Sequence, residues 1–223
     1  MGRISEALAS LFVVSVVSEV IYQVYVHFYK RVVVSEVIFF PDRGVTCSSV
    51  VHETHCSAPS CGFSHDESSL KRLLAVLDSS QRKLDVCVYL ITCDVLGDAI
   101  LRCHKRGRIV RVITDSEGSD SAESQVGRLR AAGIRVRTNN ESSFLMHHKF
   151  ALVDGNLLVS GSFNWTRQAI TSNHENLLIT EDPRLVRRYV DEFQRLWDLF
   201  RCTPLARSSL YSNPAEKQSL MCV

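Results

Sequence analysis

The residues that could do chemistry gather in the segment that begins at His147 and ends at Asn164. His147, Lys149 and Asp154 are spaced H-x-K-x4-D, and Ser162 precedes Asn164 in a G-S-x-N segment. Phosphodiester cleavage needs a nucleophile, a proton donor for the leaving oxygen, and positive or hydrogen-bonding groups around the phosphate oxygens. The histidine can attack phosphorus and form a phosphohistidine, the lysine supplies charge, and the serine and asparagine supply neutral donors. The segment therefore predicts a phosphodiesterase site.

No cluster of carboxylates accompanies this motif, and such clusters are what hold a pair of catalytic Mg²⁺ ions. We therefore expect the chemistry at His147 to be independent of a metal. Because a lone histidine beside a strand is more often structural than catalytic, the prediction depends on the strand, the turn and the G-S-x-N segment occurring together.

The positions of these residues follow from a predicted hairpin. The apolar residues 150–153 read as a short buried strand, and alternation places His147 and Lys149 on the same face of the extended chain. Asp154-Gly155-Asn156 is a hairpin turn signal, and the apolar run 157–159 follows it. The histidine, the lysine and the G-S-x-N residues can therefore converge at one end of the hairpin.

The rest of the chain alternates strands and helices, which predicts an α/β domain with a mixed central sheet flanked by helices. The expected strands are 32–40, 83–91, 108–114, 134–137 and 176–179, besides the two of the hairpin. The expected helices are 66–80, 94–105, 119–132 and 183–200, and Gly133 is expected to end the third of these. We predict a domain over residues 32–200, and the tail from 201 to 223 is expected to be disordered.

In its H-x-K-x4-D and G-S-x-N segments the chain resembles the phospholipase D superfamily over roughly residues 32–200. The resemblance implies that His147 is the nucleophile, that Lys149 and Asn164 bind phosphate, and that Asp154 supports the site. It also implies that the downstream acidic residue Glu175 orients the histidine. An ordinary carboxylate at the end of a strand remains the alternative for Glu175.

The motif occurs only once, although nucleophilic attack and protonation of the leaving oxygen are most simply divided between two histidines. Superfamily members with two motifs in one chain use one histidine for each role. A two-fold symmetric homodimer with a shared site would supply the second copy of His147. Two copies of Lys149 and two of Asn164, one of each from either subunit, would then surround one phosphate. The role of the neighbouring His148 stays open.

Residues 8–29 are largely apolar and long enough to cross a bilayer, although Glu19, Gln23 and His27 interrupt them. We predict a transmembrane signal anchor after a short tail, 1–7; a signal peptide and a core helix are the alternatives. The basic pair Lys30-Arg31 places the following domain in the cytosol and suits the mitochondrial outer membrane. A glycan on Asn164, part of an N-W-T sequon, would block the site, which disfavours a secretory location.

Cys47, Cys56, Cys61 and His65 form a C-x8-C-x4-C-x3-H segment that predicts a small zinc-binding insertion over residues 47–65. Thiolate and imidazole ligands suit a tetrahedral structural zinc ion. His52 and His55 are nearby competing ligands. A pair of disulfides or a set of free thiols is the alternative to a zinc site. A cytosolic location would disfavour disulfides.

The 223 residues carry a net charge of only +2, so any electrostatic attraction of a nucleic acid must come from local patches. Two patches are candidates, residues 104–108 and a group of arginines, Arg128, Arg130, Arg135 and Arg137. Three aromatic side chains are expected to flank the site, Phe144, Phe163 and Trp165.

The order of anchor, cysteine segment and single motif resembles the single-motif mitochondrial phospholipases D, the Zucchini group of the superfamily. That resemblance implies two substrates, cardiolipin hydrolysed to phosphatidic acid and single-stranded RNA cut during piRNA biogenesis. A nuclease would need a basic channel with stacking groups, and a lipase an apolar slot near the membrane. A non-catalytic membrane scaffold that recruits RNA-processing proteins is the third hypothesis.

Overall fold

The computed structural model describes residues 2–29, 35–42, 44, 47, 49, 54–58, 60–63, 65, 68–119, 121–139 and 144–201. The chain divides into two units, Met1–Val34 and Ser35–Val223. Several sequence predictions fall outside the described residues: the basic pair at 30–31, His52 and the tail from 202.

The N-terminal unit consists of helix α1 (Gly2–Tyr29), which contains the segment 8–29. The side chain of Gln23 donates to Glu19 at 2.7 Å, and Ser18 donates to the carbonyl of Ser15 at 3.1 Å. In the part of the chain that the structure describes, no helix has both the length and the apolar character needed to cross a membrane. The transmembrane anchor predicted over residues 8–29 stays a prediction.

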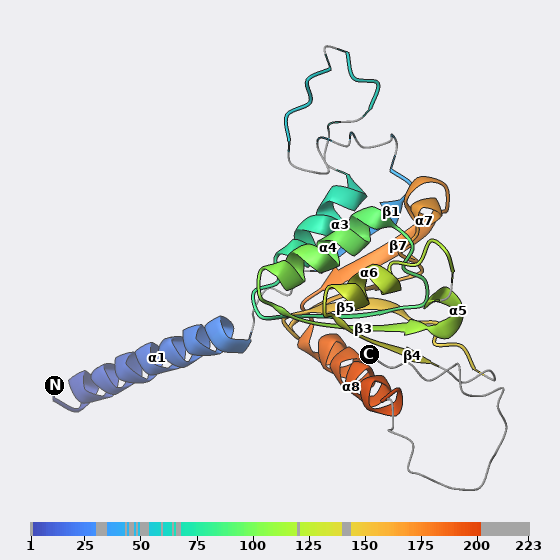
Figure 1. Ribbon diagram of the computed structural model, residues 1–223. Helices are drawn as coiled ribbons and strands as arrows, with labels where there is room; N and C mark the ends of the chain where they lie inside the picture. The colour runs from blue at the N-terminus through green and yellow to red at the C-terminus, as the bar shows by residue number, and fades with distance from the viewer. Residues whose placement is uncertain are drawn as a thin grey trace, which may run out of the picture. The chain divides into compact units, whose positions relative to one another are not determined.

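The second unit is built on a seven-stranded sheet in the order β1-β7-β6-β5-β2-β3-β4 (Figure 1). Its strands are β1 (Ser35–Phe40), β2 (Lys83–Val88), β3 (Ile109–Asp115), β4 (Arg135–Asn139), β5 (Lys149–Val153), β6 (Leu157–Gly161) and β7 (Glu175–Thr180). β2, β3 and β4 are parallel, whereas β5, β6, β7 and β1 join through antiparallel pairs. The predicted mixed central sheet is confirmed.

Helices cover both faces of this sheet, so each face has its own apolar core (Figure 1). The helices are α3 (Ser69–Asp78), α4 (Asp94–Lys105), α5 (Ser116–Ser119), α6 (Val126–Ala131), α7 (Arg167–Thr171) and α8 (Pro183–Leu199). Alternation along β5 divides its side chains between the two cores: Ala151 and Val153 join the core of α3 and α4, while Phe150 and Leu152 pack with α8.

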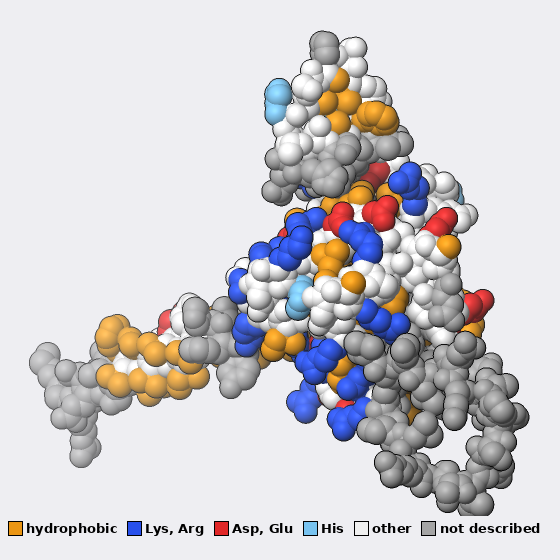
Figure 2. Space-filling model, viewed as in Figure 1, with side chains coloured by type: hydrophobic (Ala, Val, Ile, Leu, Met, Phe, Trp, Pro, Cys, Tyr) orange, Lys and Arg blue, Asp and Glu red, His pale blue; other side chains and the backbone are white. Residues whose placement is uncertain are grey.

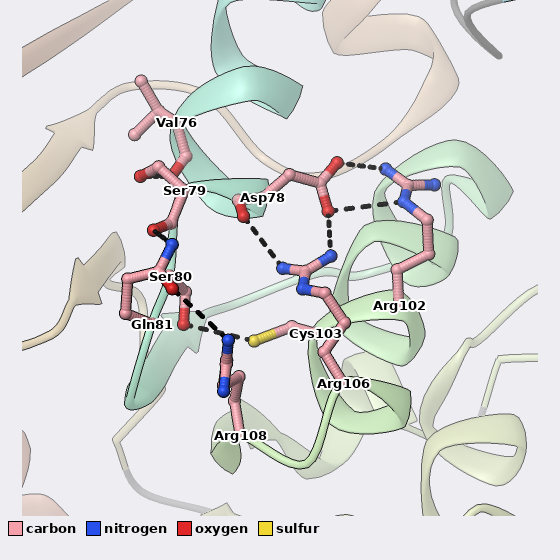
Figure 3. A network of polar contacts seen from close by, with 9 residues as sticks. All are labelled: Val76, Asp78, Ser79, Ser80, Gln81, Arg102, Cys103, Arg106 and Arg108. Atoms are coloured by element: carbon pink, nitrogen blue, oxygen red, sulfur yellow. Dashed lines mark hydrogen bonds and ion pairs between the residues drawn. The ribbon is translucent and has the colours of Figure 1, made fainter.

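Helices α3 and α4 are tied together by an ion cluster at Asp78 (Figure 3). The carboxylate accepts from Arg102 at 2.7 Å and from Arg106 at 2.9 Å. Burial alone would raise the pKa of Asp78, but the two guanidinium groups outweigh it and hold the pKa below its usual value. Arg108 donates to the side chain of Gln81 in the same cluster. Three arginines near the end of α4 therefore have partners within the fold.

The helix predicted over 119–132 is wrong in its first half, because α5 ends at Ser119 and α6 begins only at Val126. The residue between them that decides this is Gln125, which is buried. Its backbone N–H donates to the carbonyl of Ile91 at 2.9 Å, and its side-chain NH₂ donates to Asp94 at 2.8 Å. These tertiary contacts hold the chain in a loop before the helix.

Two further helix ends follow local rules. Gly133 ends α6 with a φ of +86°, and the N–H of Ile134 donates to Leu129, as predicted for a glycine cap. The short helix α7 was not predicted, although Thr166 caps it by accepting the N–H of Ala169 at 3.1 Å. Threonine at that position was the available signal.

Asp154 locks the β5–β6 hairpin to the start of β2. Its φ of +53° and that of Gly155, +74°, form the predicted tight turn. The carboxylate accepts the backbone N–H groups of Gln81, Arg82 and Lys83 at 2.8–2.9 Å. Burial would raise the pKa of Asp154, but these three hydrogen bonds outweigh it and lower the pKa. The carboxylate thus joins the loop before β2 to the end of β5.

We predict that Asp154→Asn destabilises the fold by about 1–3 kcal/mol, because one of the three N–H groups loses its acceptor. Asparagine tolerates the positive φ, so the backbone itself need not change. The depressed pKa of Asp154 means that its stabilisation is present at neutral pH and is lost as the pH falls through the folded-state pKa. Urea unfolding should show a wild-type advantage at pH 7 that shrinks in acid.

Asp182→Asn is the matched control, since Asp182 caps α8 and asparagine caps a helix equally well. Its free energy of unfolding should change by only a few tenths of a kcal/mol. If Asp154→Asn unfolded at the wild-type urea concentration at pH 7, the locking role of Asp154 would be wrong.

Candidate active site

The predicted site residues meet at one edge of the sheet, where β5 and β7 begin and β2 and β6 end. The register sets this, because Val88 pairs with Lys149 and Gly161 pairs with Leu177. His147 lies just before β5, and Ser162 follows β6. Strands of both directions thus bring their ends to the same edge of the sheet.

His147 and Lys149 are in direct contact. The ammonium of Lys149 lies 3.1 Å from Nδ1 and 3.2 Å from Nε2 of the His147 ring, and it donates to the backbone carbonyl of His147 at 2.8 Å. His147 is exposed, and Lys149 is half-buried. Burial lowers the pKa of Lys149, and the nearby carboxylate of Glu175 partly offsets this. The contact places the exposed imidazole of His147 beside a positive charge.

His148 points to the opposite side of the strand. Its Nε2 lies 3.4 Å from the carboxylate of Glu192 on α8, and its ring meets the ring of Phe150 edge-on at 5.6 Å. The alternation of the strand therefore assigns the two adjacent histidines to different faces. His147 instead contacts Lys149 and Tyr89 on the other face.

Backbone contacts on both sides of His147 fix its position. The carboxylate of Asp115, which is only 2% exposed, accepts the N–H of Met146 at 2.8 Å. The N–H of Tyr89 donates to the carbonyl of His148, also at 2.8 Å. The preceding and following residues are thus tied to the end of β3 and to the residue after β2, which leaves His147 little freedom to shift.

Ser162 and Glu175 form a hydrogen-bonded pair beside Lys149. The Ser162 hydroxyl donates to Glu175, and the side chain of Asn173 donates to the other carboxylate oxygen at 3.1 Å. Gly161 is required here, because a Cβ at this position would lie 1.9 Å from the carbonyl oxygen of Asn176. The structure brings Glu175 to the site and gives it Ser162 and Asn173 as hydrogen-bond partners.

Asn164 carries a polar atom that the described protein leaves unsatisfied. Its buried Oδ1 has no hydrogen-bond partner. An unsatisfied buried polar atom in a native fold is commonly satisfied by a ligand or an ordered water. This observation agrees with the phosphate-binding role expected for Asn164.

Asp154 is not among the residues brought together. It lies at the far end of β5, seven residues from His147, which is roughly 20 Å along an extended strand. Its carboxylate is occupied by the three backbone N–H groups before β2. The structure therefore shows Asp154 as a lock between β5 and the loop before β2, and its supporting role in the chemistry stays a prediction.

Two of the three aromatic residues expected to flank the site are core residues instead. Phe163 is fully buried and stacks on Phe40 at 4.3 Å, and Trp165 is only 2% exposed. Phe144, which is 75% exposed, remains as a surface aromatic near His147. Sequence reasoning missed Tyr89, whose ring centroid lies 4.7 Å from that of His147. The signal available for it was its place just after a buried strand.

The basic patches do not line the site. Figure 2 shows Lys and Arg side chains over the surface of α3 and α4. Residues 104–108 lie before β3, at the opposite edge of the sheet from Asp115. Arg128 is paired with Asp98 at 2.6 Å, and the guanidinium of Arg137 lies 4.0 Å from the centre of the Trp197 ring. These side chains serve the fold and the surface.

The predicted zinc ligands come together as a separate cluster. The ligand atoms of Cys47, Cys56, Cys61 and His65 all lie within 4.8 Å of one another. Two sulfur atoms, those of Cys61 and Cys47, are 3.7 Å apart, which is close to the edge of a tetrahedron with Zn–S bonds of about 2.3 Å. His55, the competing ligand within the described residues, is not a member of this group. The donor set and spacing therefore fit a tetrahedral zinc ion.

Solved structures resemble this fold. Nuc from Salmonella typhimurium, a phospholipase D family member, aligns over 76% of this chain and 97% of its own, with a TM-score of 0.59 and 23% identity. NucT from Helicobacter pylori aligns over 74% of this chain and 96% of its own, with a TM-score of 0.58 and 19% identity. At these identities the likeness establishes the fold alone.

Sequence comparisons are more specific. Residues 73–197 match the family model described as cardiolipin synthase, PLD-like domain. Proteins named mitochondrial cardiolipin hydrolase are similar in sequence. The one from Xenopus tropicalis is 46% identical over 75% of this chain and 79% of its own, and the one from Homo sapiens is 43% identical over 75% and 69%. The chain therefore belongs to the phospholipase D superfamily, in the family of the mitochondrial cardiolipin hydrolases.

Proposed function

We propose that this protein hydrolyses the phosphodiester of cardiolipin through a phosphohistidine on His147, in a homodimer with a shared active site. The observation that carries the proposal is the contact of the Lys149 ammonium with both ring nitrogens and the carbonyl of His147. An exposed imidazole held against a cation suits attack on an anionic phosphorus centre.

The reaction has two steps. A ring nitrogen of His147 bonds to phosphorus while the bond from phosphorus to the leaving oxygen breaks, and the leaving alkoxide takes a proton. Water then attacks the phosphohistidine, loses a proton to the acid–base group, and releases the phosphate monoester and the histidine. Lys149 and Asn164 contact the phosphate oxygens, and Glu175 holds Ser162 beside them.

The acid–base group is the second requirement of this scheme. His148 cannot fill it, because it lies on the α8 face with Glu192. We infer that His147 of the partner subunit supplies the proton, with the two-fold axis passing through the site. A symmetric arrangement also doubles the positive charge around one phosphate.

The substrate assignment rests on the relatives, which are named for hydrolysis of cardiolipin. Single-stranded RNA is a second candidate, and the exposed ring of Phe144 near His147 is the observation that favours it, since an exposed aromatic can stack a base. The basic side chains of residues 104–108 lie at the other edge of the sheet and do not support an RNA channel at the site.

A mitochondrial location is part of the proposal, by analogy with the same relatives. The single-pass outer-membrane anchor over residues 8–29 and the cytosolic orientation of the following domain stay predictions from the sequence. Zinc at the cysteine cluster would be structural, since its four protein ligands close the coordination shell.

His147→Asn should lower turnover of cardiolipin vesicles by at least about 10³-fold, because asparagine cannot form the covalent intermediate. His148→Asn is the matched control, since the neighbouring histidine faces α8, and it should retain turnover within about threefold. EDTA should leave the rate of the chemical step unchanged in the wild-type protein.

Released phosphatidic acid and cut 5′-labelled RNA would be measured in parallel for each protein. If the protein cut RNA and released no phosphatidic acid, RNA would replace cardiolipin as the proposed substrate. Full activity of His147→Asn on both substrates would remove the nucleophile assignment, and full biological function without turnover would favour the scaffold hypothesis.

The shared site predicts that a heterodimer of wild-type and His147→Asn chains is nearly inactive. Each reaction requires two copies of His147, so the remaining wild-type copy has no acid–base partner. The heterodimer would be isolated through two different affinity tags after coexpression. Its turnover should be below about one-tenth of that of the wild-type dimer.

The matched heterodimer with His148→Asn should keep wild-type turnover. If the His147→Asn heterodimer retained half of the wild-type rate, the two subunits would act independently. Failure to isolate any dimer would contradict the shared site directly.

Purified full-length protein should contain about one zinc ion per chain, and Cys61→Ser should lower that content and the melting temperature. Elemental analysis by mass spectrometry would give the metal content. Cys103→Ser is the control, because this buried cysteine contacts Ser80 in the α3–α4 region and is not part of the cluster. Equal zinc in wild type and Cys61→Ser would remove the zinc site.

A further inference from the structure

Tyr89 packs against the two residues that carry the proposed chemistry, yet it belongs to neither sequence motif. Its ring centroid lies 4.7 Å from that of His147, with the planes at 52°, and 5.3 Å from the ammonium of Lys149. The ring, the imidazole and the ammonium therefore form one packed group.

The ring of Tyr89 is held from several directions. Its hydroxyl donates to Glu117 at 2.8 Å, and its carbonyl accepts the hydroxyl of Thr114 at 2.9 Å. The hydrogen bond to Glu117 raises the pKa of the Tyr89 phenol, with burial adding to the effect. Glu117 is itself fixed, because its N–H donates to the buried carboxylate of Asp115 at 3.1 Å. The same carboxylate anchors the residue before His147, so the ring and the nucleophile share one support.

The face of an aromatic ring carries partial negative charge and attracts a cation within about 6 Å of its centre. When a nitrogen of His147 donates its lone pair to phosphorus, the imidazole ring acquires positive charge. A tyrosine ring beside it stabilises that charge more in the transition state than in the neutral ground state, which is the condition for accelerating the step.

We propose that Tyr89, anchored by Glu117, is a positioning residue for the covalent step: it fixes the plane of the His147 imidazole beside Lys149 and stabilises the positive charge that the ring gains on phosphorylation. The inference rests on the proposed function, because it takes His147 as the nucleophile. It adds the residue that follows β2 and one residue of α5 to a site otherwise described through the two motifs.

A purely structural role is the competing explanation, and the chain offers a matched tyrosine to separate the two. Tyr189 on α8 also packs on an aromatic ring, that of Phe150 at 4.9 Å, and its hydroxyl accepts from Ser160 at 3.1 Å. It lies on the opposite face of the sheet from His147. Replacing either tyrosine removes similar packing, but only Tyr89 contacts the nucleophile.

The experiment compares Tyr89→Leu, Tyr89→Phe and Tyr189→Leu in the full-length chain. Each would be mixed with the soluble diester bis(p-nitrophenyl) phosphate and quenched at short times, and the rates of phosphohistidine formation and turnover would be measured. We expect Tyr89→Leu to slow phosphohistidine formation and lower kcat by about tenfold, with little change in KM, because the charge stabilisation is lost. Tyr89→Phe keeps the ring and should stay within about threefold of wild type.

Tyr189→Leu should lower the melting temperature without slowing phosphohistidine formation in the folded protein. The proposal is overturned if Tyr89→Leu forms phosphohistidine at the wild-type rate, or if Tyr189→Leu slows it equally. Equal losses in Tyr89→Leu and Tyr89→Phe would also overturn it, because the hydroxyl and not the ring would then be responsible.

A wild-type protein that forms no phosphohistidine would be a failure of the proposed function. The contact itself is then tested by NMR. Ring protons of His147 should show a ring-current shift that Tyr89→Phe keeps and Tyr89→Leu removes. Unchanged His147 resonances in Tyr89→Leu would overturn the positioning role independently of any activity.

Discussion

The site depends on the antiparallel register between β5 and β2. Val88 pairs with Lys149, and the hydrogen bond from Tyr89 to the carbonyl of His148 extends the pairing past the strand end. A slip of one residue would exchange the faces of all side chains on β5 and turn His148, instead of His147, toward the G-S-x-N segment. The contact between His147 and Lys149, on which the proposed chemistry rests, depends on this register.

The H-x-K-x4-D motif therefore contains residues of the proposed site and a residue that stabilises the fold. Its histidine and lysine stand at the edge where strand ends meet, whereas its aspartate lies at the far end of the same strand. Asp154 binds three backbone N–H groups before β2 and so fixes the same β5–β2 pairing from the other side. The residues between His147 and Asp154 in the motif include the whole of β5, so the motif spans the strand from one end to the other.

The two faces of the sheet give the adjacent histidines His147 and His148 different surroundings. The α8 face takes His148, Phe150 and Leu152 into contact with one long amphipathic helix, and Glu192 on that helix holds the second histidine. The other face leaves His147 exposed beside a half-buried lysine. Adjacent histidines with different surroundings thus have different roles, and alternation alone separates them.

The features that could be predicted from the sequence are those determined by residues close together in the chain. The hairpin turn at Asp154-Gly155, the glycine cap at Gly133 and the alternation of strands and helices all rest on neighbouring residues. Contacts between distant strands could not be read in that way. Phe163 looked like a site aromatic, but it is drawn into the core against Phe40. Gln125 likewise interrupts a predicted helix through its bonds to Ile91 and Asp94.

Tyr89 and Asp115 illustrate the same limit within the site. Each follows or ends an apolar strand and carries no motif of its own, so its role appears only when the sheet brings β2, β3 and β5 together. The phosphate-binding role of Asn164, in contrast, was predicted from its motif, and its buried Oδ1 has no hydrogen-bond partner among the described residues.

The covalent intermediate is the most direct test of the central claim. Full-length protein would be mixed with cardiolipin vesicles, quenched within the first turnover in alkali, which preserves phosphohistidine, and digested for peptide mass spectrometry. The account predicts a phosphorylated adduct on His147 and an unmodified His148 in the same peptide. Turnover without any adduct on His147, or an adduct on His148, would contradict it.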